Sequence, residues 1–196
     1  MKEFTNRYIL VYSAVLVVIV ALILTVVSVS LSPLQERNRQ LEQKQMILKT
    51  IGVASTPDDA ERLYASHIEE CEEGGVPYYR FEGGYVIPME GNGLWGPIWG
   101  YIAIDEEGTV MGAVFDHKGE TPGLGGEIAS DRFAERFVGK SMREAPICLK
   151  KHADPSSPYE VDAISGGTMT SQGVTAMLEK TYNRYYTLFF GCRYEK

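Results

Sequence analysis

The chain begins with an apolar run that is too long for most soluble folds. Residues 8–32 contain no charged side chain, and the uncharged stretch extends from Arg7 to Glu36. As a helix, residues 8–32 measure about 36 Å, enough to cross a hydrocarbon core of roughly 30 Å. A signal peptide has a shorter apolar region of about 7–15 residues, and a buried soluble helix seldom lacks a polar face for so many turns. We therefore predict an uncleaved transmembrane helix at residues 8–32, with a signal peptide and a buried helix as the alternatives.

The charges around this run leave its orientation open. Lys2 and Arg7 precede it, and four Lys or Arg residues follow it before residue 50. Because positive charge is retained in the cytoplasm, the count mildly favours a cytoplasmic location for the remainder of the chain. A large translocated domain can override such a count, so charge alone does not decide the topology.

Net charge differs sharply between the two parts of the chain. Residues 1–50 hold six Lys/Arg and three Asp/Glu, a net of +3, and the whole chain carries −7, which leaves −10 for residues 51–196. Binding to a nucleic-acid backbone requires clustered Lys and Arg. This acidic part therefore argues against nucleic acid as a partner.

The cysteines and histidines show no spacing typical of a metal site. Cys71, Cys148 and Cys192 form no Cys-x-x-Cys pair, and the three histidines are scattered, so we expect no bound metal. The cysteines are either isolated thiols or, in an oxidising compartment, one disulfide with a spare thiol.

The remaining pattern predicts an α+β fold, with an antiparallel sheet flanked by helices after one membrane helix. Residues 33–55 are expected to form a juxtamembrane helix and connector, and residues 56–196 a single domain. The expected elements are a helix at 56–70, a strand at 79–88 interrupted at Gly83 and Gly84, a hairpin of strands at 97–105 and 108–116, a helix at 131–138, a short strand at 159–164 and a final helix after residue 168.

The final helix has the clearest pattern. Its apolar side chains fall on one face, which we interpret as core packing. They are Val174, Met177, Leu178, Thr181, Tyr182, Tyr185, Leu188 and Phe189.

Residues 162–174 place a hydroxyl, Thr168, behind Gly166 and Gly167 and just before this helix. Glycines let a backbone curl closely around a bulky group. A helix start offers free N–H groups and the positive end of a dipole, which suits a phosphate. The alternative is an ordinary loop in which Thr170 or Ser171 caps the helix.

Two other segments are rich in glycine. Residues 117–127 follow an expected strand and contain Glu120, Thr121 and Leu124, and residues 91–101 place Trp95 and Trp99 beside glycines. These segments are either an ordinary loop and core tryptophans, or a backbone that closely approaches a flat ligand with an aromatic wall beside it.

Three motifs together carry a family resemblance. Asp-Ala-Ile-Ser-Gly-Gly-Thr at 162–168 resembles the flavinylation motif Asp-x-x-Ser/Thr-Gly-Ala-Thr/Ser, with Gly167 in place of alanine. With Gly-Leu-Trp at 93–95 and Glu-Thr-Pro-Gly-Leu-Gly-Gly-Glu at 120–127, the chain resembles the C subunit of the Na⁺-translocating NADH:quinone reductase over nearly its whole length. The G subunit of the Rnf-type ferredoxin:NAD⁺ reductase is the related alternative.

The resemblance implies a covalent flavin carrier. FMN is expected as a phosphoester on Thr168, installed by a separate flavin transferase. The chain is expected to be a subunit of an ion-translocating NADH:quinone reductase, in which it carries electrons and by itself catalyses no bond chemistry. The phosphate and ribityl chain would be held by Ser165, Gly166, Gly167, Thr170 and Ser171, and the ring bordered by Trp95, Glu120, Thr121 and Leu124.

The resemblance also implies a location and partners. Residues 1–7 would be a short cytoplasmic N-terminus, and the domain at 56–196 would lie on the outer side of the inner membrane. The partners would be the membrane, flavin and iron–sulfur subunits of a reductase complex. Asp162 is either recognised by the transferase or is only a strand-end carboxylate. A membrane-anchored extracytoplasmic ligand-binding or sensing module without covalent flavin is the alternative from a different class.

Overall fold

The computed structural model describes residues 6–189, and the chain divides after Glu42 into two compact units. Helix α1 (Asn6–Thr50) runs through Pro33, so the two expected helical segments form one helix. Within residues 6–189, α1 is the one helix long and apolar enough to cross a membrane. Its apolar side chains are exposed, and the Ser13 and Ser30 hydroxyls donate to carbonyls one turn earlier. The first unit is therefore consistent with a single-pass membrane anchor.

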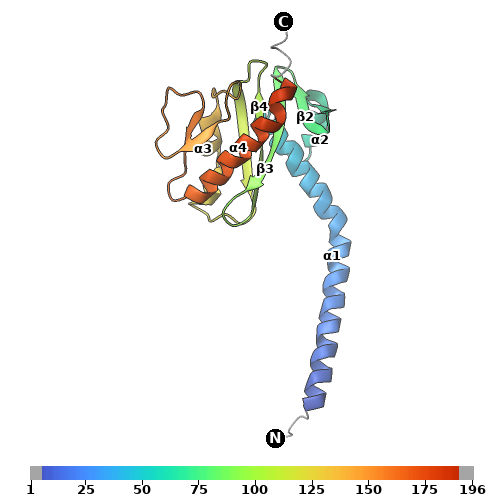
Figure 1. Ribbon diagram of the computed structural model, residues 1–196. Coiled ribbons are helices and arrows are strands. Elements are labelled where there is room, and N and C mark those ends of the chain that lie inside the picture. The colour runs from blue at the N-terminus through green and yellow to red at the C-terminus, as the bar shows by residue number, and fades with distance from the viewer. Residues whose placement is uncertain (1–5, 190–196) are drawn as a thin grey trace. The chain divides into compact units, whose positions relative to one another are not determined.

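The second unit is built on a five-stranded antiparallel sheet whose strands follow chain order (Figure 1). The strands are β1 (Glu69–Glu73), β2 (Val76–Phe81), β3 (Gly84–Asn92), β4 (Pro97–Ile104) and β5 (Val110–His117). A second, parallel sheet pairs β6 (Cys148–Lys150) with β7 (Glu160–Asp162). The helical elements are α2 (Ala60–His67), the 3₁₀ turns η1 (Gly125–Ala129) and η2 (Glu135–Phe137), α3 (Asp131–Ala134) and α4 (Thr168–Phe189).

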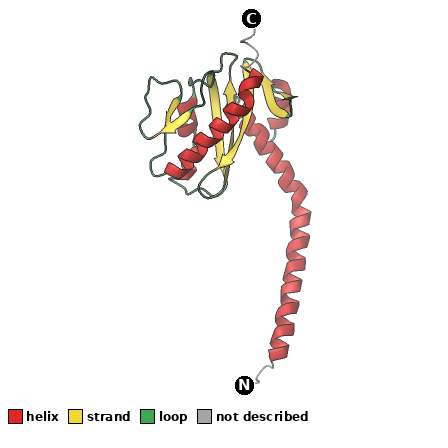
Figure 2. Ribbon diagram, viewed as in Figure 1, coloured by secondary structure: helices red, strands yellow, loops and turns green. Residues whose placement is uncertain are grey.

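Helices cover both faces of the large sheet. Adjacent residues of a strand point to opposite faces, and apolar side chains on both faces are buried under helices. In β3, Ile87 joins the core under α4, whereas Val86 joins the core under α2 and the last turns of α1. In β4, Ile102 and Ala103 divide in the same way. The long helix in front of the sheet in Figure 2 is α4. The expected α+β architecture is confirmed.

Helix α4 lies very close to the C-terminal end of β3, because glycines remove the side chains between them. A Cβ atom at Gly173 would overlap the carbonyl oxygen of Asn92, and one at Gly91 would press on Met177. The apolar face expected for this helix is confirmed: Val174, Met177, Leu178, Thr181 and Tyr185 are buried.

Several expected boundaries are wrong. The strand expected at 79–88 is two antiparallel strands, because the chain reverses at Gly83, where φ is +111°. The helix expected at 56–70 is limited to Ala60–His67, and Glu69–Glu73 forms the largely exposed edge strand β1. The helix expected at 131–138 is α3 followed by η2, and the strand expected at 159–164 is the shorter β7. Strand β6 has no counterpart among the expected elements, whereas the hairpin formed by β4 and β5 is confirmed.

We predict that Gly173→Ala destabilises the globular unit by about 1–3 kcal/mol, although alanine is the better helix former. The added methyl group must displace the backbone at Asn92. Thermal unfolding of the full-length protein in detergent measures the effect. Gln172→Ala, at an exposed position of the same turn, is the control, and equal unfolding temperatures for the two variants would contradict the close approach.

Candidate functional site

The start of α4 is fixed by a tight turn at residues 164–167. The Gly167 amide donates to the Ile164 carbonyl (3.1 Å), and the Ile164 amide donates to the Ser171 hydroxyl (3.1 Å). The turn requires a glycine at position 166, where φ is +76°. Thr168 is the first residue of the helix, rather than the residue before it, and is exposed. The Ser171 amide donates to the Gly167 carbonyl (2.8 Å), whereas the amides of Thr168, Met169 and Thr170 precede the first such bond and can face an anion.

A buried carboxylate joins this helix start to two loops. One Glu120 oxygen accepts from the Thr170 hydroxyl (2.6 Å), and the other accepts from the Trp95 amide (2.8 Å). The exposed fractions are 4% for Glu120 and 2% for Thr170. Trp95 lies in the β3–β4 turn, which the Gly93 amide closes by donating to the Gly96 carbonyl (2.8 Å). Glu120 therefore connects three segments that are distant in sequence.

Glycines also allow the β3–β4 turn, the Glu120 segment and the start of α4 to approach one another closely. A Cβ atom at Gly93 would meet one carboxylate oxygen of Glu120, and a Cβ atom at Gly125 would overlap the other oxygen and the Thr170 hydroxyl. A Cβ atom at Gly166 would press on the Leu124 side chain, in addition to the strain of its positive φ. Side chains at these positions would push the segments apart.

The three segments enclose an open pocket of about 150 Å³. Eight of the residues predicted from the sequence line it: Trp95, Glu120, Thr121, Leu124, Gly166, Gly167, Thr168 and Thr170. Ser165 is exposed outside this lining, and Ser171 is buried beneath it, where its hydroxyl holds the Ile164 amide. The three glycine-rich segments are thus brought together as the sequence motifs suggested.

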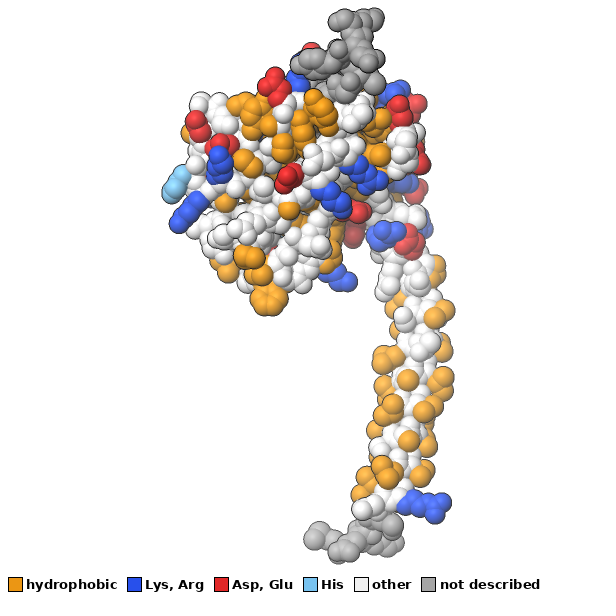
Figure 3. Space-filling view, viewed as in Figure 1, with side chains coloured by type: hydrophobic (Ala, Val, Ile, Leu, Met, Phe, Trp, Pro, Cys, Tyr) orange, Lys and Arg blue, Asp and Glu red, His pale blue; other side chains and the backbone are white. Residues whose placement is uncertain are grey.

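The pocket also contains residues that sequence reasoning missed, namely Leu94, Gly125 and Met169. With Trp95 and Leu124, two of them form an apolar rim, defined here as Leu94, Trp95, Leu124 and Met169. The exposed fractions of the rim side chains lie between 43% and 69%. Figure 3 shows hydrophobic side chains projecting at the end of the unit where the β3–β4 turn lies in Figure 1. The sequence signal was present, since each missed residue adjoins a predicted one.

The carboxylate of Glu120 is held in its charged form. Shielding from water raises the pKa of Glu120, but hydrogen bonds from Thr170 and from the amides of Trp95 and Leu94, together with nearby His117, act in the opposite direction. The net result is a pKa below the ordinary value for glutamate. The pocket wall therefore carries a negative charge at neutral pH.

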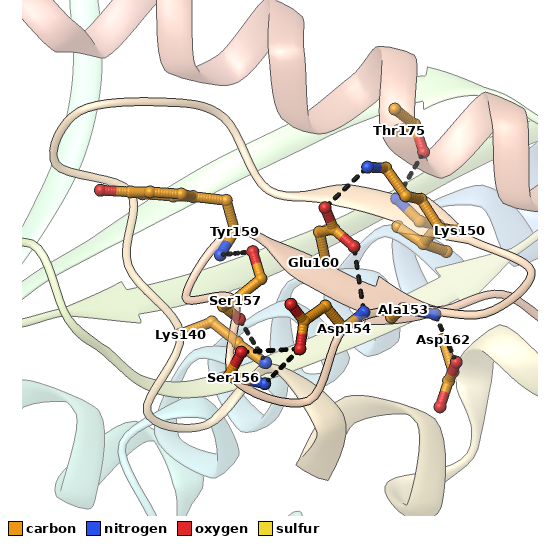
Figure 4. A network of polar contacts seen from close by, with 11 residues as sticks. Lys140, Lys150, Ala153, Asp154, Ser156, Ser157, Tyr159, Glu160, Asp162 and Thr175 are labelled. Atoms are coloured by element: carbon orange, nitrogen blue, oxygen red, sulfur yellow. Dashed lines mark hydrogen bonds and ion pairs between the residues drawn. The ribbon is translucent and has the colours of Figure 1, made fainter.

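The strand that leads into the site is fixed by a polar network (Figure 4). The Asp162 carboxylate accepts from the Ala153 amide (3.0 Å), and the Glu160 carboxylate accepts from the Lys150 ammonium (2.6 Å) and the Asp154 amide (3.0 Å). Arg136 donates to the Asp162 carbonyl (2.9 Å). Asp162 is thus a strand-end carboxylate with a structural partner, and recognition by a transferase stays a prediction.

A larger hollow of about 240 Å³ lies elsewhere and contains none of the predicted residues. Two of its polar side chains, Tyr185 and Arg184, already have contacts within the protein. The Tyr185 hydroxyl donates to the Pro77 carbonyl (2.5 Å), and the Arg184 guanidinium lies 5.9 Å from the Tyr185 ring centre. We therefore assign the functional site to the smaller pocket, where hydroxyl, free amides and an apolar rim converge.

Metal-binding geometry is missing from the described part of the chain: residues 6–189 contain no group of three His, Cys, Asp or Glu side chains placed to hold an ion. Cys71 and Cys148 are free thiols and so are not bonded to each other. Cys192 lies outside the described residues.

Comparison with known proteins points to one family. The FMN-binding domain family matches residues 93–183. The C subunit of the Na⁺-translocating NADH-quinone reductase of Neisseria meningitidis is 41% identical over 97 residues, which cover 47% of this chain and 38% of that protein. The C subunit from Vibrio vulnificus is 34% identical over 136 residues, covering 64% and 51%. The chain thus spans about half or less of the length of these curated relatives.

Solved structures share the fold. The crystal structure of the Na⁺-translocating NADH-quinone reductase C subunit from Parabacteroides distasonis superposes with a TM-score of 0.72 at 31% identity, covering 82% of this chain and 97% of that one. The structure of Shewanella oneidensis NqrC has a TM-score of 0.64 at 18% identity, covering 79% and 99%, and supports the fold alone.

We predict that ionised Glu120 stabilises the fold in a pH-dependent manner. Because the pKa of Glu120 is lower in the folded than in the unfolded state, its contribution is complete above the unfolded value of about 4.3. The contribution is lost as pH falls through the folded-state pKa. The stability difference between the wild type and Glu120→Gln should therefore be constant well above pH 4.3 and shrink as the pH falls below about 4.3.

Denaturant unfolding at each pH measures this difference. Glu127→Gln, which changes an exposed carboxylate of η1, is the control. A difference for Glu120→Gln that is independent of pH would contradict the prediction.

Proposed function

Because the chain belongs to the C-subunit family of the Na⁺-translocating NADH-quinone reductases, with their FMN-binding domain, we propose that it carries FMN covalently on Thr168 and relays electrons within such a reductase. The observation that carries this proposal is the position of Thr168. This residue is exposed, begins helix α4 and lines the pocket under the apolar rim.

The chemistry of the residues present fits a flavin nucleotide, of which the pocket would enclose a part. The first-turn amides of α4 and the positive end of its dipole suit the phosphate. Gly166 and Gly167 line the pocket without side chains, and the rim offers a flat ring an apolar contact. A pocket of about 150 Å³ is smaller than the roughly 300 Å³ or more that encloses a drug-sized ligand. Part of the nucleotide would therefore remain accessible to a redox partner.

Attachment requires an external enzyme, because a threonine hydroxyl is a weak nucleophile without a base. In the proposed reaction, the Thr168 oxygen forms a bond to the FMN phosphorus of FAD. The phosphoanhydride bond to AMP breaks, AMP leaves, and the hydroxyl proton passes to a base of the flavin transferase. The Thr168 position at the exposed helix start leaves the oxygen accessible to that enzyme.

FMN, when bound, supplies the electron chemistry, and the chain binds and orients it. We propose an iron–sulfur centre in neighbouring subunits as the electron donor and a second covalent flavin in another membrane subunit as the acceptor. Helix α1 is proposed to hold the domain at the membrane, with residues 1–7 in the cytoplasm, residues 8–32 in the bilayer, residues 33–55 as juxtamembrane helix and connector, and residues 56–196 on the outer side.

We predict that Thr168→Ala abolishes the covalent FMN adduct, because the other hydroxyls of the first turn, those of Thr170 and Ser171, are buried. Full-length protein is purified from its native host, where the flavin transferase is present, and analysed by intact mass and by fluorescence in a denaturing gel. Thr168→Ser should retain the adduct, and Thr187→Ala, far along α4, should leave it unchanged. A wild-type chain without an adduct would refute the proposal and favour a reversible binding module.

We predict that alkaline phosphatase fused after residue 196 is active in cells, because that enzyme requires the oxidising space outside the cytoplasm. Green fluorescent protein fused at the same point should remain non-fluorescent when the fusion is exported by the Sec pathway. The reverse pattern would place the domain in the cytoplasm, as the charge count on either side of the apolar run mildly favours.

A further inference from the structure

Glu120 stands out because its charge is not part of a salt bridge among the described residues, although His117 lies nearby. Within residues 6–189, the ion pairs do not include Glu120. The charge is stabilised by neutral donors, the Thr170 hydroxyl and the Trp95 amide. A buried charge is costly unless it is hydrogen-bonded, and these bonds, rather than a salt bridge, keep the anion at a fixed place.

The carboxylate is also held in one orientation. The Glu120 amide donates to the His117 ring nitrogen (3.3 Å), which anchors its backbone. Gly93 and Gly125 border the two carboxylate oxygens so closely that neither position has room for a Cβ atom. With both oxygens bonded and both sides packed, the carboxylate cannot turn away from the pocket that it lines.

We infer that Glu120 is a positioning residue whose fixed negative charge also lowers the reduction potential of the flavin held in this pocket. The inference rests on the proposed function, and it assigns Glu120 a role beyond bordering the ring. Reduction brings negative charge into the pocket, and a like charge on the wall opposes it, the more strongly where water is excluded. Through Thr170 and Trp95, the same side chain sets the spacing between the helix start and the apolar rim.

Two substitutions separate the charge from the hydrogen bonds. Glu120→Gln keeps the size of the side chain and can still accept one hydrogen bond through its amide oxygen, but removes the charge. Thr170→Val keeps the charge and removes the hydroxyl donor. Glu127→Gln removes an exposed charge from the following η1 turn and is the control.

The midpoint potential of the flavinylated full-length protein is measured by redox titration, after intact mass has shown the adduct. Glu120→Gln should retain the adduct and raise the ratio of reduced to oxidised flavin at the wild-type midpoint about tenfold, a shift of about +30 mV for a two-electron couple. Neither Thr170→Val nor Glu127→Gln should shift the potential upward. An unshifted potential in Glu120→Gln, or an equal shift in Glu127→Gln, would overturn the effect of the charge.

Hydrogen exchange tests the positioning role without any flavin. In the Thr168→Ala background, Thr170→Val should increase amide exchange in residues 93–97 and 168–172, whereas Glu127→Gln should not. Unchanged exchange in Thr170→Val would overturn the positioning role. A wild type without an adduct would refute the proposed function and, with it, the effect on the potential. An adduct in Glu120→Gln whose potential equals that of the wild type would refute this inference alone.

Discussion

The close approach of α4 to the C-terminal end of β3 is the constraint on which the site depends. Gly173 meets the Asn92 carbonyl with no side chain between them, and Gly91 leaves room for Met177. The buried residues of α4 then fix the helix on the sheet, since interiors are packed too densely for it to slide. This contact brings the start of α4, with Thr168, beside the β3–β4 turn that carries Trp95.

Within this frame, the site combines parts with different requirements. Binding of a phosphate is favoured by free amides at a helix start. Binding of a flat ring is favoured by exposed apolar side chains, and soluble proteins rarely expose such side chains as one large patch. The apolar rim and the first turn of α4 meet over one buried carboxylate. The charge of Glu120 gives this pocket an electrostatic character that its neutral neighbours do not.

Much of the fold was predictable because its signals are local. The alternation of β4 and β5 and the apolar stripe of α4 are repeating patterns along one segment, and the hairpin and the helix were both identified. The failures occurred where tertiary contacts override local pattern. Strand β1 is polar and pairs only along one edge, and the reversal at Gly83 was mistaken for an interruption of a single strand.

The sequence by itself determined the long apolar helix, the hydroxyl behind two glycines and the glycine-rich segments, because chain length, backbone freedom and side-chain chemistry are properties of neighbouring residues. Only the tertiary structure decided which side chains share the pocket. It buried Ser171 beneath the turn, added Leu94 and Met169 to the rim, and joined Glu120 to Thr170 across 50 residues of sequence. No periodicity encodes such a contact, since it arises from the packing of α4 on the sheet.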